Sequence, residues 1–189
     1  MYPEKKTIMN PETAKKIGSA LAVKSVSIGL VIAYIIMVPV SLMGNNKSLW
    51  QAMLWIIDWI QSEFLFHIII GIIAFYACGY FFGGRAGKSI LIKHRNYLLV
   101  GVMCGLLTLL TTVFLGTLTG FFMGLIHGRH YIDTADDLKQ SDFIYENFIN
   151  YIFKPMFWFS IFGFLPAIGV GVWFGWRLKR KGASTEAEV

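Results

Sequence analysis

The chain has 189 residues, of which 56% are hydrophobic and 15% are charged, and its mean hydropathy is +0.59. Soluble domains carry roughly 25% charged residues, so this composition excludes an ordinary soluble domain and predicts a single all-α integral membrane domain over residues 1–189. The net charge of +6 is no sign of nucleic-acid binding, because the basic residues flank apolar segments, where they report membrane topology.

The first part of the chain, residues 1–24, is polar and basic and is predicted to form a cytoplasmic tail. Asn10 followed by Pro11 and Glu12 has the pattern of a helix start, with asparagine as the N-cap and proline at the first helical position. Residues 25–44 form the first predicted transmembrane span. This apolar run exceeds the roughly 7–15 residues of a signal-peptide core, and no small-residue cleavage site follows it, so we predict a retained span.

Residues 48–63 mix tryptophans and aliphatic residues with polar positions such as Asp58. Because tryptophan prefers the headgroup region, this segment predicts an outer interfacial amphipathic helix, and the second span then covers residues 64–83. A single crossing helix over 49–83 would instead place Asp58 in the hydrocarbon at high cost. The predicted interfacial anchors are Trp50, Trp55 and Trp59.

The link after the second span reads GGRAGKSILIKHRN and contains four basic residues and no acid. A phosphate-binding loop of the form GxxxxGK[ST] would require glycine at the position of Phe82, and it would follow a strand rather than a membrane helix. We therefore predict a positively charged turn that faces the cytoplasm and contacts anionic lipid. Its basic residues are Arg85, Lys88, Lys93 and Arg95.

The third and fourth predicted spans, residues 96–127 and 155–176, carry small residues at steps of four. Such residues share one helix face, and in a bilayer they allow two helix backbones to approach closely. Antiparallel packing would use the inner glycines of both spans and would leave the outer groove of the third span for another helix or subunit, which favours a homo-oligomer. The predicted packing or oligomer residues are Gly101, Gly105, Gly116, Gly120 and Gly124 on the third span, and Gly163, Ala167, Gly171 and Gly175 on the fourth.

Residues 134–152 are predicted to form a second outer interfacial helix, and residues 177–189 a second cytoplasmic tail. Thirteen lysines and arginines lie on the two tails and the second link, against four on the opposite side, which satisfies the positive-inside rule for four spans. We predict a multi-pass protein of the bacterial inner membrane with both termini in the cytoplasm. The basic residues of the carboxy-terminal tail are Arg177, Lys179, Arg180 and Lys181.

The sequence offers few residues for catalysis or metal binding. Imidazoles and carboxylates at His127, His130 and Asp133 have suitable ligand chemistry, but no established metal motif is present, so a solvated acidic loop is favoured and metal binding stays open. Cys78 and Cys104 lie in apolar spans without CxxC spacing and are interpreted as core residues. No catalytic residue and no cofactor is predicted.

These features predict a non-enzymatic, oligomeric inner-membrane subunit that acts as an anchor or a sensor of envelope stress or attack. Its partners would be the bilayer, including anionic lipids, further copies of itself and a soluble cytoplasmic protein at the basic surface. The alternative is a small channel or transporter component, in which threonine-bearing helices such as residues 96–127 surround a pore. A lipid-modifying enzyme using His127, His130 and the neighbouring aspartates is a third and weaker interpretation.

Overall fold

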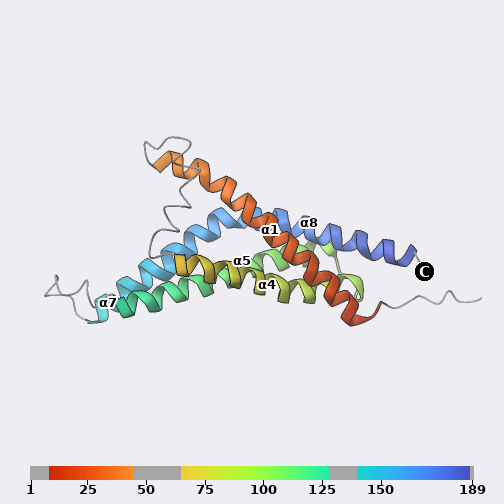
Figure 1. Ribbon diagram of the computed structural model, residues 1–189, viewed down its shortest axis with the longest axis horizontal. Coiled ribbons are helices and arrows are strands. Elements are labelled where there is room, and N and C mark those ends of the chain that lie inside the picture. Colours follow the sequence, from red (N-terminus) through yellow and green to blue (C-terminus); the bar gives the residue numbers. More distant parts are fainter. Residues whose placement is uncertain (1–8, 45–64, 128–139, 188–189) are drawn as a thin grey trace, which may run out of the picture. The chain divides into compact units, whose positions relative to one another are not determined.

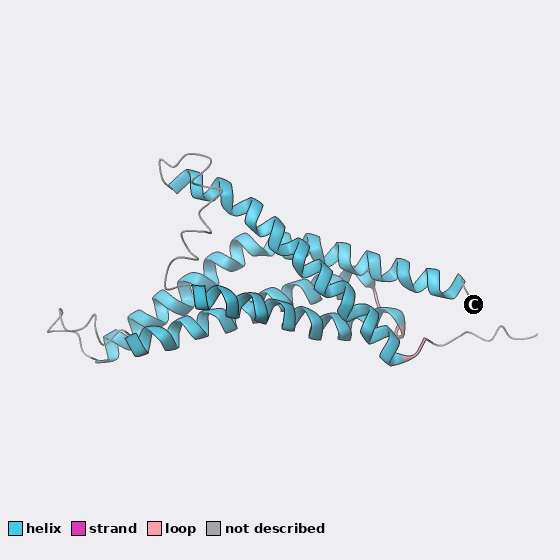
Figure 2. Cartoon of the chain, viewed as in Figure 1, coloured by secondary structure: helices cyan, strands magenta, loops and turns pink. Residues whose placement is uncertain are grey.

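The computed structural model describes residues 9–44, 65–127 and 140–187, and within these ranges the chain is helical apart from residues 9–10 and 92–96, with no strand (Figures 1 and 2). The predicted interfacial helix 48–63, with Trp50, Trp55 and Trp59, lies outside them, as do residues 128–139 with His130 and Asp133. In chain order the elements are α1 (Pro11–Gly44), α4 (Leu65–Leu91), α5 (Tyr97–His127), α7 (Gln140–Phe148), the π-helix η1 (Ile149–Phe153) and α8 (Lys154–Ala187).

Four of these helices contain stretches long and apolar enough to cross a membrane, which confirms the predicted number of candidate spans. Helices α1 and α8 have 34 residues each, or about 51 Å at 1.5 Å per residue, and this exceeds the roughly 30 Å thickness of a bilayer's hydrocarbon core. Each of these two helices is therefore longer than a single crossing of the hydrocarbon core requires. The candidate stretches are Pro11–Ile36, Ile68–Leu91, Tyr97–Met123 and Ile144–Ser184.

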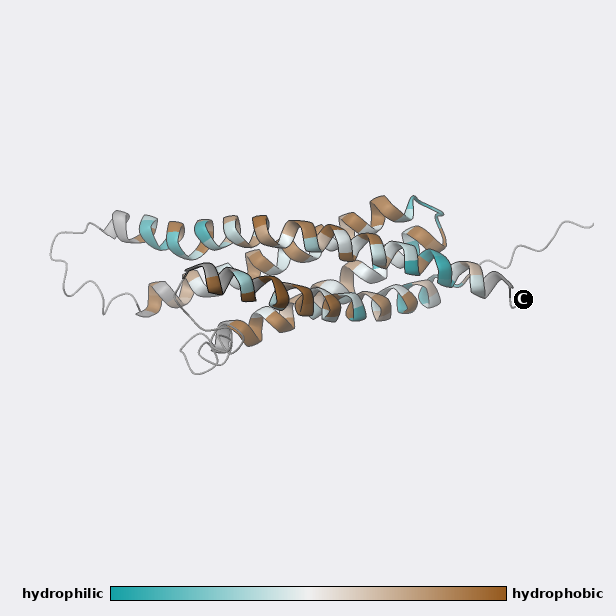
Figure 3. Ribbon diagram, turned by 90° about the horizontal axis from the view of Figure 1, so that it is seen from above, coloured by the Kyte–Doolittle hydropathy of each residue, from teal (hydrophilic) through white to brown (hydrophobic). Residues whose placement is uncertain are grey.

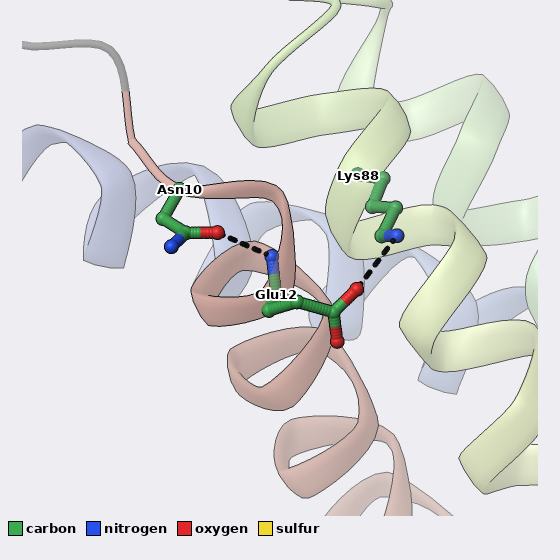
Figure 4. A network of polar contacts seen from close by, with 3 residues as sticks. All are labelled: Asn10, Glu12 and Lys88. Atoms are coloured by element: carbon green, nitrogen blue, oxygen red, sulfur yellow. Dashed lines mark hydrogen bonds and ion pairs between the residues drawn. The ribbon is translucent and has the colours of Figure 1, made fainter.

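The start of α1 is the one predicted from the sequence. The Asn10 side-chain oxygen Oδ1 accepts a hydrogen bond from the backbone N–H of Glu12 at 2.9 Å, so it serves as the N-cap (Figure 4). The carboxylate of Glu12 also pairs with the Lys88 ammonium of α4 at 3.3 Å. Residues 11–24, predicted as part of a tail, are thus the first turns of a long helix.

Helix α4 is longer than the second predicted span, because it does not end at Gly83 but continues to Leu91. The charged turn is confined to residues 92–96, where His94 has a φ of 47° in the left-handed region that histidine tolerates better than most residues. The Asn96 side chain then caps α5 by accepting hydrogen bonds from the N–H groups of Leu98 at 3.0 Å and Leu99 at 3.4 Å. The observed helix is longer than the prediction because Arg85 and Lys88, which were assigned to the turn, lie on the last turns of α4.

The predicted break between an outer helix at 134–152 and a span from 155 is also absent, since α7, η1 and α8 follow one another without interruption. Pro155 has no N–H and its ring would clash with a carbonyl four residues earlier in an α-helix. Widening the preceding turn relieves this clash, and the Lys154 N–H bonds to the Ile149 carbonyl five residues back. Helix α8 then runs past the predicted end at Trp176 as far as Ala187.

The chain divides into two compact units. Unit 1 consists of Met1–Ala33, Tyr76–Thr108 and Leu165–Val189, and unit 2 of Tyr34–Phe75 and Leu109–Phe164. In unit 1, one hydrophobic core draws residues from α1, α4, α5 and α8, whereas large apolar side chains are mostly exposed in the described part of unit 2. The buried core of unit 1 contains Ala14, Leu21, Ala22, Ala86, Ile90, Leu91, Cys104, Phe174 and Leu178.

Candidate functional site

Helices α5 and α8 touch through their backbones at five of the predicted small residues. A Cβ atom added at Gly101 would overlap the Gly171 carbonyl oxygen and lie 3.1 Å from the Gly175 Cα. A Cβ added at Gly105 would overlap the Ala167 carbonyl oxygen and lie 3.4 Å from the Gly171 Cα. These residues therefore form an antiparallel helix contact inside unit 1.

A second contact of the same kind, between α1 and α4, was not predicted. Added Cβ atoms at Gly18 and Gly83 would each collide with the other helix, and Gly87 lies against Ala14. The Ser19 hydroxyl donates a hydrogen bond to the Tyr80 carbonyl at 2.9 Å across the same contact. The signal was available in the sequence, because Ala14, Gly18 and Ala22 on one helix and Gly79, Gly83 and Gly87 on the other recur at steps of four.

The other predicted packing residues have different surroundings. A Cβ at Gly163 would lie 2.9 Å from Leu109 Cδ1 within unit 2, whereas one at Gly120 would lie 3.6 Å from Tyr151. At Gly116, no atom of the described ranges lies within 4 Å of an added Cβ. Gly124 lies outside the residues whose surroundings the structure describes.

The predicted basic residues gather at one end of unit 1. This end is defined by the start of α1, the end of α4, the turn 92–96, the start of α5 and the end of α8, as the Glu12–Lys88 ion pair and the contact of Gly182 with Leu91 show. We call it the basic end. Figure 3 shows hydrophilic residues in the carboxy-terminal part of α8, and others in α7 and the turns that follow it. The basic end contains Arg85, Lys88, Lys93, Arg95, Arg177, Lys179, Arg180 and Lys181.

Three of the four basic residues near the end of α8 contact aromatic rings. The Arg177 guanidinium lies 5.5 Å from the Trp173 ring centre, and the Arg180 guanidinium lies 4.7 Å from that of Trp176. The Lys179 ammonium lies 4.7 Å from the Tyr97 ring on α5. Each such cation–π contact contributes about 0.5–1 kcal/mol at an exposed site. Leu178, between them, is fully buried in the core, so residues 177–181, predicted as part of a tail, belong to α8, with Leu178 packed and the four basic residues exposed.

Polar groups inside the spans are mostly satisfied by their own helix. The hydroxyls of Thr108, Thr117 and Thr119 donate to carbonyls three or four residues earlier at 2.7–2.9 Å. Thr112 differs, since its side chain is buried and its hydroxyl has no hydrogen-bond partner in the described parts of the chain. Cys78 and the buried Cys104 are free thiols.

No group of three or more histidine, cysteine, aspartate or glutamate residues occurs in the described ranges with metal-binding geometry. The residues considered as metal ligands, His130 and Asp133, lie outside those ranges, and so does the side chain of His127.

In comparisons with known proteins, no family model matches the chain, and no curated protein or solved structure matches it either. Its class follows from the fold itself. The four candidate spans indicate a multi-pass α-helical membrane protein, with a basic, aromatic-supported surface at one end of its packed unit.

Proposed function

We propose that the protein is a non-enzymatic inner-membrane subunit that anchors a soluble acidic partner at its basic end and associates with further copies of itself. The observation that carries this proposal is the ordered basic face of α8. A loose charged tail would report topology only, whereas cations fixed by ring contacts and by the buried Leu178 present a surface of defined shape.

The charge balance supports this location for a partner. Within residues 9–33, 76–108 and 165–184 of unit 1, eleven lysines and arginines face a single acid, Glu12, which already pairs with Lys88. A surface of one sign attracts an oppositely charged partner and speeds its association. The positive-inside rule assigns this end to the cytoplasm, which is where a soluble partner would be met.

We expect the partner to be lost when four charges are removed from α8. A photo-crosslinking amino acid at the exposed Ala183 should give one discrete adduct in intact cells. The adduct should fall at least about tenfold when Arg177, Lys179, Arg180 and Lys181 are all changed to glutamine, because the electrostatic attraction is removed. The same crosslinker at Leu165, an exposed apolar position on the same helix, should give no such adduct. An unchanged adduct in the quadruple variant, or none in the wild type, would remove the basis for an anchoring role.

Self-association is proposed through the outer glycines of α5. A Cβ added at Gly116 would meet no other part of the described chain within 4 Å, so a second copy has room to approach α5 beside this residue.

We expect Gly120→Leu to convert a discrete oligomer into a monomer, because leucine fills the groove along which the copies approach. The measurement is the mass of the protein in nanodiscs. Gly71→Leu is the control, since a Cβ added at Gly71 meets nothing within 4 Å, and one added at Gly120 meets Tyr151 at an ordinary contact distance of 3.6 Å. A wild-type monomer would contradict self-association and confine these glycines to packing within one chain.

A pore is the second candidate, and Thr112 is the observation that favours it. A buried hydroxyl without a partner is costly within one chain and would be satisfied by water or by a neighbouring copy. Ion flux into liposomes that contain the oligomer, lost on Thr112→Leu, would support a pore. An assembled oligomer without ion flux would exclude the pore and would be consistent with the anchoring role. The proposed sensing role rests on the two interfacial helices predicted at 48–63 and 134–152, of which residues 48–63 and 134–139 lie outside the described ranges.

A further inference from the structure

A groove open to the surface lies between α4 and α5 in unit 1, beside the turn that joins them. It has a volume of about 520 Å³. Each helix contributes residues three and four positions apart, which places them on one face, so the groove follows the two helices away from the turn. It does not use the basic residues of α8 to which the proposed partner binds.

The end of the groove next to the turn is polar and positively charged. Arg85 and Ser89 line it from α4, and Arg95 and Asn96 line it from the turn. Both arginine side chains are exposed, and neither forms an ion pair within the described parts of the chain, because Glu12 is engaged by Lys88. No carboxylate is among the residues that line the groove. The charge of this end is therefore available to an anion.

The rest of the groove is apolar. Its wall on α5 includes Leu99, Met103 and Leu107, of which Leu99 is 65% and Met103 51% exposed, and Phe82 lies on the α4 side. From Asn96 at its polar end to Leu107, the whole groove extends about 16 Å along the helix axis, at 1.5 Å per residue. That is roughly half the thickness of the hydrocarbon core, or the depth of one leaflet.

We propose that this groove is a binding site for one anionic phospholipid of the cytoplasmic leaflet. Arg85 and Arg95 bind the phosphate, Ser89 donates a hydrogen bond to it, and one acyl chain lies along Leu99, Met103 and Leu107. Arginine matches phosphate geometry with paired N–H donors, and basic pockets between membrane helices select anionic headgroups. The inference rests on the membrane insertion included in the proposed function, but not on the soluble partner.

The positive charge at one end of the groove and the length of its apolar wall together distinguish between the candidate ligands. A free phosphate ion would use the two arginines and leave the apolar wall unoccupied. A zwitterionic lipid would use the wall but would bring a cationic group toward two arginines. An anionic phospholipid alone satisfies both ends of the groove.

The test is a lipid titration of the purified, delipidated full chain in detergent, followed by native mass spectrometry. Phosphatidylglycerol should bind at least about tenfold more tightly than phosphatidylcholine with the same acyl chains, and this preference should vanish in Arg85→Gln/Arg95→Gln. Lys16→Gln/Lys24→Gln is the matched control, because it removes two exposed positive charges from α1 outside the groove, and it should retain the preference.

A second variant separates a lipid from a phosphate ion. Met103→Trp places a bulky ring where the acyl chain would lie, so it should weaken phosphatidylglycerol binding about tenfold without removing a charge. Displacement of phosphatidylglycerol by millimolar inorganic phosphate, with no effect of Met103→Trp, would overturn the proposal in favour of a simple anion site. Equal affinity for both lipids, or an unchanged preference in the double arginine variant, would overturn it outright.

Membrane insertion is checked separately by carbonate extraction of whole membranes. A protein that resists extraction but shows no lipid preference would contradict this inference alone. A protein released by carbonate would contradict the proposed function as well.

Discussion

Gly18→Ala is expected to destabilise the protein by about 1–3 kcal/mol, although alanine is by itself a better helix former than glycine. The added methyl group would overlap the Gly83 carbonyl oxygen and lie 2.8 Å from the Gly87 Cα. Both neighbours are backbone atoms of α4, so no side chain can rotate away and the two helices must separate. Separation would also weaken the Ser19 hydrogen bond across the same contact.

The matched control lies on the same helix. At Gly29 the nearest atom to an added Cβ is Val170 Cγ2 at 3.9 Å, an ordinary van der Waals distance. Gly29→Ala should therefore be neutral or stabilising by up to about 1 kcal/mol, from helix propensity alone. Both variants can be compared by resistance to unfolding in mixed detergent–SDS micelles, followed by circular dichroism. Equal stability of the two variants would mean that α1 and α4 do not touch at Gly18.

Leu178→Ala is expected to cost about 2–5 kcal/mol, because the side chain is fully buried where α8 meets the core of unit 1. The loss combines the apolar surface removed from contact with the cavity left behind. Since Leu178 lies between Arg177 and Lys179, the variant should also loosen the basic face and reduce the crosslink from Ala183.

The control is Leu165→Ala, the same substitution on the same helix at a position that is 76% exposed. Its effect on stability should remain within about 0.5 kcal/mol. The same unfolding assay compares the two variants. A small effect at Leu178 would show that the end of α8 is not packed in solution, and it would also weaken the argument for an ordered partner surface.

The number of candidate spans in the described ranges was predictable from the sequence, because a run of twenty apolar residues has few soluble alternatives. The ends of the helices were not. Charged residues at Arg85 and Lys88 were interpreted as a turn, yet a helix can extend beyond the apolar core and present its charges to water. The start at Asn10 was predicted correctly because capping is local, depending on one side chain and the N–H groups next to it.

For the basic end, the sequence predicted which residues take part but not how they are arranged. The basic residues were recognised, but their ordering depends on rings that come from other turns and another helix, such as Tyr97 beside Lys179. The contact at Gly18 was missed because this glycine lies in a stretch flanked by lysines rather than in the most apolar window. The groove between α4 and α5 could not be predicted from the sequence, since it depends on how Arg85 of α4 and Met103 of α5 are placed relative to each other.

The two tight backbone contacts also bear on the order in which the chain assembles. Helices α1 and α4 meet through Gly18, Gly83 and Gly87, and every residue of that contact precedes the turn at 92–96. During synthesis this first hairpin can close as soon as Leu91 has been inserted, before α5 exists. The second hairpin, α5 with α8, would then close against a pair of helices that is already packed, so that assembly in a membrane would proceed by pairs of helices.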